Sequence, residues 1–291
     1  MANYLDPKND LTFKRVFGQH KHLCISLINS MLPFENPIVS IEYQTGELIP
    51  ELANVLRNTI VDVRCTDSDG KQFIVEMQMY WSESFKSRVL LNASKAYVMQ
   101  LDKAKDFTLL QPVYALNFVN ETFEKELENE YFHHYKIVNI KDTEKQIKGL
   151  EFVFLELPKF KPQGRVEKKL HDLWLSFLTD INEETKEVPK ELLDNEFTRE
   201  ALEYMKRAAY TKKELEAYDK WKIDVMTERS AINDARKEGL AEGESIGIEK
   251  GIEKGEKLKT IEIAKELKSI GIPFDKISLS TKLTIEEIEK I

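Results

Sequence analysis

The chain has 291 residues, of which 42% are hydrophobic and 32% are charged, and its formal net charge is −8. This length predicts one large domain with an appended region, and the acidic balance excludes a protein whose whole surface is basic for DNA binding. The two cysteines exclude a disulfide framework. Without a signal-peptide pattern or an apolar run near the roughly 20 residues of a membrane span, we expect a cytoplasmic protein that does not contact a membrane.

The first predicted element is a helix from Leu11 to about Leu32. Asn9 or Asp10 can accept hydrogen bonds from the free N–H groups at its start. Apolar residues recur along it at helical spacing, and the proline that follows ends it. A strand is expected next, over residues 38–44.

Residues 59–80 have the sequence TIVDVRCTDSDGKQFIVEMQMY, which is typical of two β-strands joined by a tight turn. Ser68–Gly70 fits a three-residue loop in which Gly70 adopts the left-handed conformation that only glycine adopts cheaply. Such a loop pairs Asp67 with Lys71. A loop of two or four residues would shift the strand pairing by one residue.

Counting back from this turn places Asp62 directly opposite Glu76, and Gln78 shares their face because side chains alternate along a strand. Both strands are apolar on both faces, as strands in the middle of a covered sheet are. Opposed carboxylates about 5 Å apart repel each other, and a cation between them reverses that interaction. Pairing of the two acids with buried Arg or Lys, or a position at strand ends in water, is the alternative.

A second helix is predicted from Ser84 to about Lys103, with an apolar face that includes Phe85 and Val89. On an adjacent face, Arg88, Asn92 and Lys95 recur at helical spacing. Three further strands are expected after it, over Pro112–Val119, Tyr131–Ile140 and Leu150–Leu157.

The remaining chain is predicted to be helical from Val166 to about residue 235, and a glycine repeat follows. The repeat has a period of four residues and consists of Gly239, Gly243, Gly247, Gly251 and Gly255. Each glycine inside a helix costs about 1 kcal/mol relative to alanine. The segment is therefore either a flexible linker or a helix whose glycines approach a partner helix closely.

A small helical module is predicted at the end of the chain. Gly271 would close one helix, and Thr284 with Glu287 forms a capping box for the last one. The spacing is similar to a reduced helix-turn-helix, but the acidic last helix would repel phosphate. A contact with protein or a vestigial role is the preferred interpretation.

The hairpin resembles the active-site hairpin of the PD-(D/E)XK nuclease superfamily, in which an acid on one strand and E-x-K on the next bind Mg²⁺. One branch is more similar, the recombination-promoting nuclease (Rpn) group, also described as PD-(D/E)XK family transposases. The resemblance to this branch is carried by the E-x-Q form of the hairpin, LDPKNDLTFKRVFG (Leu5–Gly18) and RVLLNASKAYVMQL (Arg88–Leu101). It covers about the first half of the chain, and the glycine-rich tail is similar as well.

The resemblance implies an α/β fold with a restriction-endonuclease-like core, a central mixed sheet flanked by helices, and a C-terminal helical region. The expected parts are a nuclease-like domain over 1–165, a helical subdomain over 166–235, the glycine repeat over 236–256 and the helical module over 257–291.

The implied activity is a metal-dependent DNA endonuclease that hydrolyses phosphodiester bonds. Asp62 and Glu76 would be catalytic residues that hold Mg²⁺, or Mn²⁺ or Ca²⁺ in its place, through hard oxygen ligands. Gln78 stands where the superfamily has its lysine. Glutamine can hydrogen-bond the attacking water but carries no charge, so the role of the lysine is left open.

Five further residues have candidate roles beside this site. Asp10, Lys14 and Tyr97 are candidate accessory residues, with Lys14 a candidate substitute for the missing lysine. Arg88 and Lys95 are candidate contacts to DNA phosphates. Each has a structural alternative: a helix cap for Asp10, a core ring for Tyr97, and solvated helix charges for the three cations.

A second function is a nuclease-like scaffold without activity, which binds DNA or a partner protein and forms homo-oligomers through its tail. The acidic balance and the missing lysine motivate it. In either case, the resemblance implies a bacterial protein linked to recombination, mobile elements or defence against foreign DNA. Nothing in the sequence indicates strand transfer, so the word transposase is not taken literally.

Overall fold

The computed structural model describes residues 4–32, 34, 36–44, 63–101, 106–161 and 169–291. The chain divides into two compact units, Met1–Val225 and Met226–Ile291. None of the described helices combines the length and the apolar character that crossing a membrane requires.

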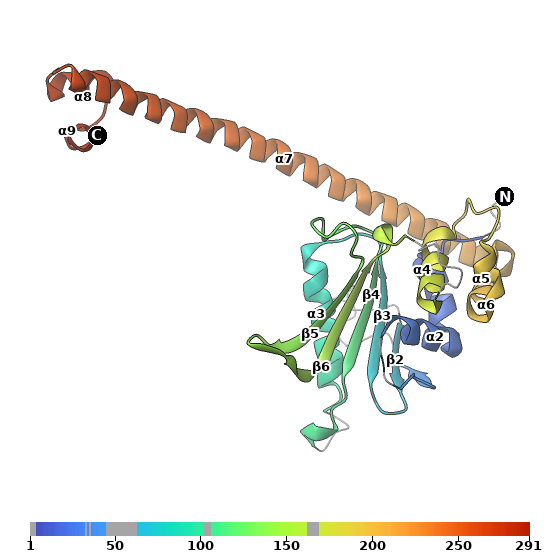
Figure 1. The fold of residues 1–291 in the computed structure, drawn as a ribbon. Helices are drawn as coiled ribbons and strands as arrows, with labels where there is room; N and C mark the ends of the chain where they lie inside the picture. The colour runs from blue at the N-terminus through green and yellow to red at the C-terminus, as the bar shows by residue number, and fades with distance from the viewer. Residues whose placement is uncertain (1–3, 33, 35, 45–62, 102–105, 162–168) are drawn as a thin grey trace. The chain divides into compact units, whose positions relative to one another are not determined.

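The first unit contains a mixed sheet with the strand order β1-β2-β3-β4-β6-β5, drawn in Figure 1. Strands β3, β4 and β6 pair in parallel, and the other neighbours pair antiparallel. The fold is therefore α/β with a restriction-endonuclease-like core, as the resemblance implied. The bounds are β1 Ile41–Tyr43, β2 Val63–Asp67, β3 Gln72–Gln78, β4 Val113–Val119, β5 Phe132–Asn139 and β6 Asp142–Glu156.

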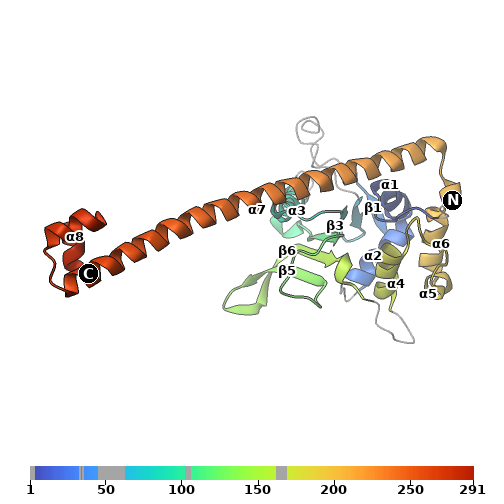
Figure 2. The same cartoon turned by 90° about the horizontal axis from the view of Figure 1, so that it is seen from above.

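Helices cover both faces of this sheet, so the central strands are apolar on both sides. Helix α3 (Glu83–Val98) packs on one face and forms a core with residues such as Ile74. On the other face lies a larger core that includes Leu27, Trp174 and Leu202. The helices on that side gather together in Figure 2 and are α2 (Lys21–Met31), α4 (Leu170–Asp180), α5 (Lys190–Asp194) and α6 (Glu196–Met205).

The β2–β3 hairpin has the turn that the sequence predicts. Gly70 has φ +88°, and the Asp67 N–H donates to the Lys71 carbonyl oxygen at 3.0 Å. Val63 pairs with Val75, in the register that a three-residue loop sets. The two- and four-residue alternatives are thereby excluded. Asp62 itself lies outside the described residues.

The predicted helix from Leu11 to Leu32 is wrong as a single element. Asn9 caps its start, accepting a hydrogen bond from the Leu11 N–H at 2.9 Å. The chain then forms α1 (Asp10–Phe13), a π-helical turn η1 (Lys14–Gly18) and, after an extended residue, α2. Gly18 weakens the helix locally, and burial of the residues on both sides of the break outweighs the continuous apolar period that predicted one helix.

Strand β6 is longer than predicted, because it begins at Asp142 and not near Leu150. Its first residues are polar and mostly exposed, so they lack the apolar run that marks the rest of the strand. They extend beyond the covered part of the sheet as a hairpin with β5. The other strands lie within the predicted ranges, and α3 starts one residue before the predicted start.

Helix α7 (Lys212–Ser269) has 58 residues and contains the whole glycine repeat. A Cβ atom added at any of its five glycines would meet nothing within 4 Å among the described residues. The repeat is thus helical, and its roles as a linker or as a contact face both stay predictions.

The end of the second unit forms the predicted small module. Gly271 closes α7 with φ +82°, and the capping box of Thr284 and Glu287 opens α9 (Ile285–Lys290). Helix α8 (Phe274–Thr281) lies between them in sequence. Ala264, Ile277 and Ile288 form the core of the module, which therefore has apolar packing of its own.

A buried charge network closes the end of β6. Glu156 is fully buried and accepts hydrogen bonds from Lys159 Nζ at 2.7 Å and from the Phe123 N–H at 2.8 Å, with His133 Nε2 also at 2.7 Å. Burial alone would raise the pKa of Glu156, but these hydrogen bonds outweigh it and lower the pKa below its ordinary value. The network connects the end of β6 to the segments that contain Phe123, His133 and Lys159.

We expect Glu156→Gln to lower the free energy of unfolding at pH 7 by about 3–5 kcal/mol, because it leaves Lys159 buried beside an uncharged partner. Because the pKa of Glu156 is lowered in the folded protein, its charge stabilises the fold fully above the ordinary Glu pKa. This stabilisation is lost as the pH falls through the pKa of Glu156 in the folded protein. Thermal melts at pH 7 and pH 4 measure both effects. Glu144→Gln, at an exposed position of the same strand, is the control, and equal melting temperatures for the two variants would contradict the prediction.

Candidate active site

Strand β3 presents Glu76 and Gln78 to helix α3. Side chains alternate along the strand, and Ile74 packs in the α3 core whereas Val75 belongs to the core on the other face. Glu76 and Gln78 share the face of Ile74. The predicted common face of the E-x-Q pair is therefore the face that α3 covers.

The Glu76 carboxylate is buried beside Asn92 of α3 and next to Asn117 in the sheet register. Its exposed fraction is 7%, and Asn92 Nδ2 donates to its Oε1 at 3.2 Å. Asn117 of β4 pairs with Glu76 in the sheet register. The Oδ1 atoms of Asn92 and Asn117 are buried and have no hydrogen-bond partner in the described part of the chain. Such atoms are uncommon in folded proteins and suggest a ligand.

Burial raises the pKa of Glu76, and the nearby Arg88 guanidinium and the hydrogen bond from Asn92 lower it only in part. The ionised form therefore carries a net cost in the folded protein. A cation bound to the carboxylate would offset that cost. A buried carboxyl group with a raised pKa is a frequent property of functional sites.

Gln78 holds Arg88 in place. Its Oε1 accepts a hydrogen bond from Arg88 at 2.7 Å, and its Nε2 donates to the Tyr80 carbonyl oxygen at 2.8 Å. Both ends of the amide thus contact protein groups. The sequence predicted that Gln78 can hydrogen-bond the attacking water. In the structure, the Gln78 side chain orients the Arg88 guanidinium.

The other candidates are distributed over several elements. Lys14 Nζ lies 2.6 Å from Asp10 Oδ1, one turn away in the N-terminal segment. Lys95 Nζ, on α3, is buried without a hydrogen-bond partner within the described ranges. Tyr97 packs on the α3 core beside Gly149 of β6. The contacts of Tyr97 match its structural alternative.

Sequence reasoning missed Asn92 and Asn117 as neighbours of Glu76. Asn92 follows Arg88 by four residues, so its helical spacing placed it on the right face without naming its partner. Asn117 lies in an otherwise apolar strand, and its own polar side chain was the only feature of the sequence that could have marked it as a site residue. Its position beside Glu76 depends on the β3–β4 register, which the sequence does not show.

The donors around Glu76 fit a hard divalent cation. Carboxylate and amide oxygens are the ligands that Mg²⁺ and Ca²⁺ prefer, and two of the amide oxygens here are unsatisfied. Among the residues that the structure describes, no three His, Cys, Asp or Glu side chains cluster as a metal site. Completion of the site by Asp62 stays a prediction.

A family model described as PD-(D/E)XK nuclease family transposase matches residues 7–235. Comparisons with curated proteins and with solved structures give no match. The matched range contains Glu76, Gln78, Arg88 and Asn92.

We expect Glu76→Gln to raise the melting temperature by about 2–4 °C at pH 8 in the presence of EDTA, because it removes a buried charge. The raised pKa means that the cost of the charge is absent below the ordinary Glu pKa and complete above the folded-state value. The gain should therefore vanish toward pH 4, and Mg²⁺ should stabilise the wild type more than the variant. Glu144→Gln is the exposed control, and a variant less stable than wild type at pH 8 would contradict the prediction.

Proposed function

The chain belongs to the PD-(D/E)XK nuclease family transposases, and we propose that it is a metal-dependent DNA endonuclease that hydrolyses phosphodiester bonds. The observation that carries the proposal is the buried Glu76 carboxylate, which has unsatisfied oxygen atoms beside it and an arginine held nearby. A role in recombination, mobile elements or defence belongs to the proposal, as does a cytoplasmic location.

Asp62 and Glu76 would hold Mg²⁺, or Mn²⁺ or Ca²⁺, in the proposed site. The hairpin register from Val63 to Asp67 supports this assignment, because its extension by one pair is the one that opposes Asp62 to Glu76. A divalent cation, when bound, polarises the scissile phosphate and lowers the pKa of the attacking water. The net cost of the Glu76 charge without a cation supports an ion at this carboxylate.

Arg88 would supply the positive charge that the E-x-Q hairpin lacks. Its guanidinium is fixed by Gln78 at 2.7 Å and by its position 5.0 Å above the Phe85 ring. A guanidinium binds phosphate oxygens with two parallel N–H groups. Gln78 would then be a positioning residue that holds Arg88 toward the DNA phosphate.

Lys95 would contribute through its charge. Its buried Nζ has no hydrogen-bond partner in the described ranges, and it follows Asn92 by about one turn of α3. A cation in this position raises the potential of the α3 face and favours anions there. Homo-oligomerisation through the C-terminal region completes the proposal.

Cleavage of supercoiled plasmid at low salt with Mg²⁺, Mn²⁺ or Ca²⁺ tests the activity. We expect Asp62→Asn and Glu76→Gln each to reduce the nicking rate by at least about 100-fold, because each removes a charged metal ligand. Glu203→Gln, at an exposed site on α6, should cut like the wild type. Nicking that is unchanged in both variants would overturn the site, and a wild type that cuts with none of the metals would favour the inactive scaffold.

Arg88→Met should weaken DNA binding and lower the slope of log K against log salt by about 0.9, the value for one lost phosphate contact. Gln78→Met should weaken binding less, because Arg88 stays but is no longer held. Fluorescence anisotropy at several salt concentrations measures both slopes. The control is Arg199→Met, on the exposed surface of α6. An unchanged slope for Arg88→Met would exclude Arg88 as a phosphate contact.

A further inference from the structure

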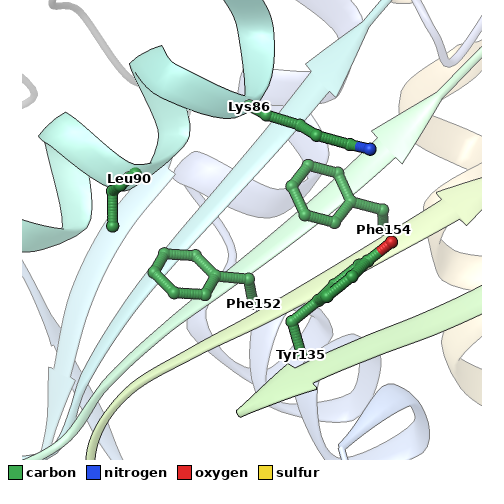
Figure 3. A pocket seen from close by; sticks show the side chains of 5 residues that line it. All are labelled: Lys86, Leu90, Tyr135, Phe152 and Phe154. Atoms are coloured by element: carbon green, nitrogen blue, oxygen red, sulfur yellow. The ribbon is translucent and has the colours of Figure 1, made fainter. Parts of the chain in front are cut away.

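An apolar pocket of about 190 Å³ lies between α3 and the end of the sheet. As Figure 3 shows, Lys86 and Leu90 come from α3, Tyr135 from β5, and Phe152 and Phe154 from β6. Three of the five side chains are aromatic, and the lysine amino group and the tyrosine hydroxyl are the polar groups. Half of Leu90 and 41% of Tyr135 are exposed, so the pocket opens to solvent.

The pocket and Glu76 share one face of the sheet. In the parallel register Glu76 pairs with Asn117, and Asn117 pairs with Phe154. Two strand spacings therefore separate Glu76 from Phe154, a distance of about 10 Å. On α3, Arg88 is two residues from both Lys86 and Leu90, so it points to another side of the helix, toward Gln78 of β3. The sheet row from Glu76 to Phe154, and not the α3 side chains, is what places the pocket near the site.

We propose that this pocket takes one unpaired nucleobase of the DNA substrate; the proposal rests on the proposed DNA binding and adds a preference for DNA with unpaired bases. Aromatic side chains bind bases by stacking, whatever the base, because every base has a π-face. The Tyr135 and Phe154 rings are nearly perpendicular, with centroids 5.8 Å apart. Phe154 is only 4% exposed, so Tyr135 and the partly exposed Phe152 are the rings that a base can reach.

Size and charge favour a base over other occupants. The volume is below the roughly 300 Å³ at which pockets for drug-sized ligands begin, which leaves room for one ring system. Lys86 adds a cation at the rim, where the sugar-phosphate chain of a bound base would pass. Its ion pair with Glu124, at 3.3 Å, is half-exposed and weak, so Lys86 can turn to a phosphate.

A pocket with so few polar groups cannot read the hydrogen-bonding edge of a base. It should therefore select DNA by structure and not by sequence. Extrusion of a base from a perfect duplex costs a few kcal/mol, and a base that is already unpaired avoids this cost. Bulges, mismatches and single strands are the forms of DNA that the pocket would favour.

Anisotropy with the full-length protein in EDTA at low salt tests this proposal separately from cleavage. The probes are a perfect duplex, the same duplex with one unpaired adenine, and the same duplex with an abasic site in place of that adenine. We expect the wild type to bind the adenine bulge roughly tenfold more tightly than either other probe, the value for one stacked base. With 2-aminopurine at the bulge, the probe fluorescence should fall on binding.

Two variants change the pocket in opposite ways. Leu90→Trp fills it and Tyr135→Ala removes one wall; both should abolish the preference for the bulge and leave duplex binding unchanged. Tyr135→Phe should keep the preference. Phe107→Ala, a matched loss of an aromatic ring that is 79% exposed and outside the pocket, should also keep it.

The outcomes distinguish the two proposals. Equal wild-type binding of all three probes, or a preference that persists in both pocket variants, overturns the base pocket and leaves the nuclease proposal intact. No binding of any probe by the wild type overturns the DNA-binding function itself. A change of sedimentation coefficient in Leu90→Trp and Tyr135→Ala, with the preference unaltered, assigns the pocket to a contact between copies of the chain and also overturns the proposal.

Discussion

The hydrogen-bonded registers of the sheet, beginning with the Gly70 turn, determine which side chains meet α3. From this turn, β2 and β3 pair so that Arg64 and Ile74 share the α3 face. On the same face, another row across β3, β4 and β6 holds Glu76, Asn117 and Phe154. A slip of one residue would exchange the faces of β2 and move its side chains into the opposite core. The position of Asn117 and the aromatic pocket depend on the parallel registers, and the proposed pairing of Asp62 with Glu76 depends on the register of the Gly70 turn.

Within that alignment, the partner of Arg88 determines what Glu76 can do. A direct ion pair would neutralise the carboxylate and occupy its oxygens. Arg88 instead donates a 2.7 Å hydrogen bond to Gln78, while Asn92 donates a single hydrogen bond to Glu76. The charge of Arg88 still lowers the pKa of Glu76, against the larger effect of burial. The Glu76 carboxylate thus lies near the Arg88 charge but keeps its oxygen atoms free of a direct ion pair with it. Gln78 of β3 produces this arrangement because it binds the Arg88 guanidinium of α3.

The features that the sequence predicted are those encoded within a few residues. Gly70 determines the hairpin turn, Asn9 and Thr284 cap their helices, and helical spacing placed Arg88, Asn92 and Lys95 on one face. Features that depend on distant pairing were missed. The break after Gly18 follows from tertiary packing that overrides a continuous period, and the position of Asn117 beside Glu76 follows from a parallel register that leaves no local pattern. The pocket joins three elements, so no single segment indicated it. The placement of Asp62 stays a prediction.

The acidic net charge of −8 and the proposed DNA binding are reconciled by where the cations of the α3 face lie. Lys86, Arg88 and Lys95 belong to one helix, and Arg64 lies on the same face of the sheet beneath it. Lys95 Nζ and Arg64 are buried, so solvent screens their charges less than it screens those of exposed lysines. Their field therefore acts over a longer range. A local positive potential next to a hard-oxygen site attracts phosphate even when acids elsewhere in the chain dominate the sum. Residues 212–291 hold 16 Lys and Arg against 18 Asp and Glu and contribute only −2 of the net charge. Most of the acidic excess therefore lies in residues 1–211, and the position of the α3 cations, not the overall sign, decides where DNA would bind.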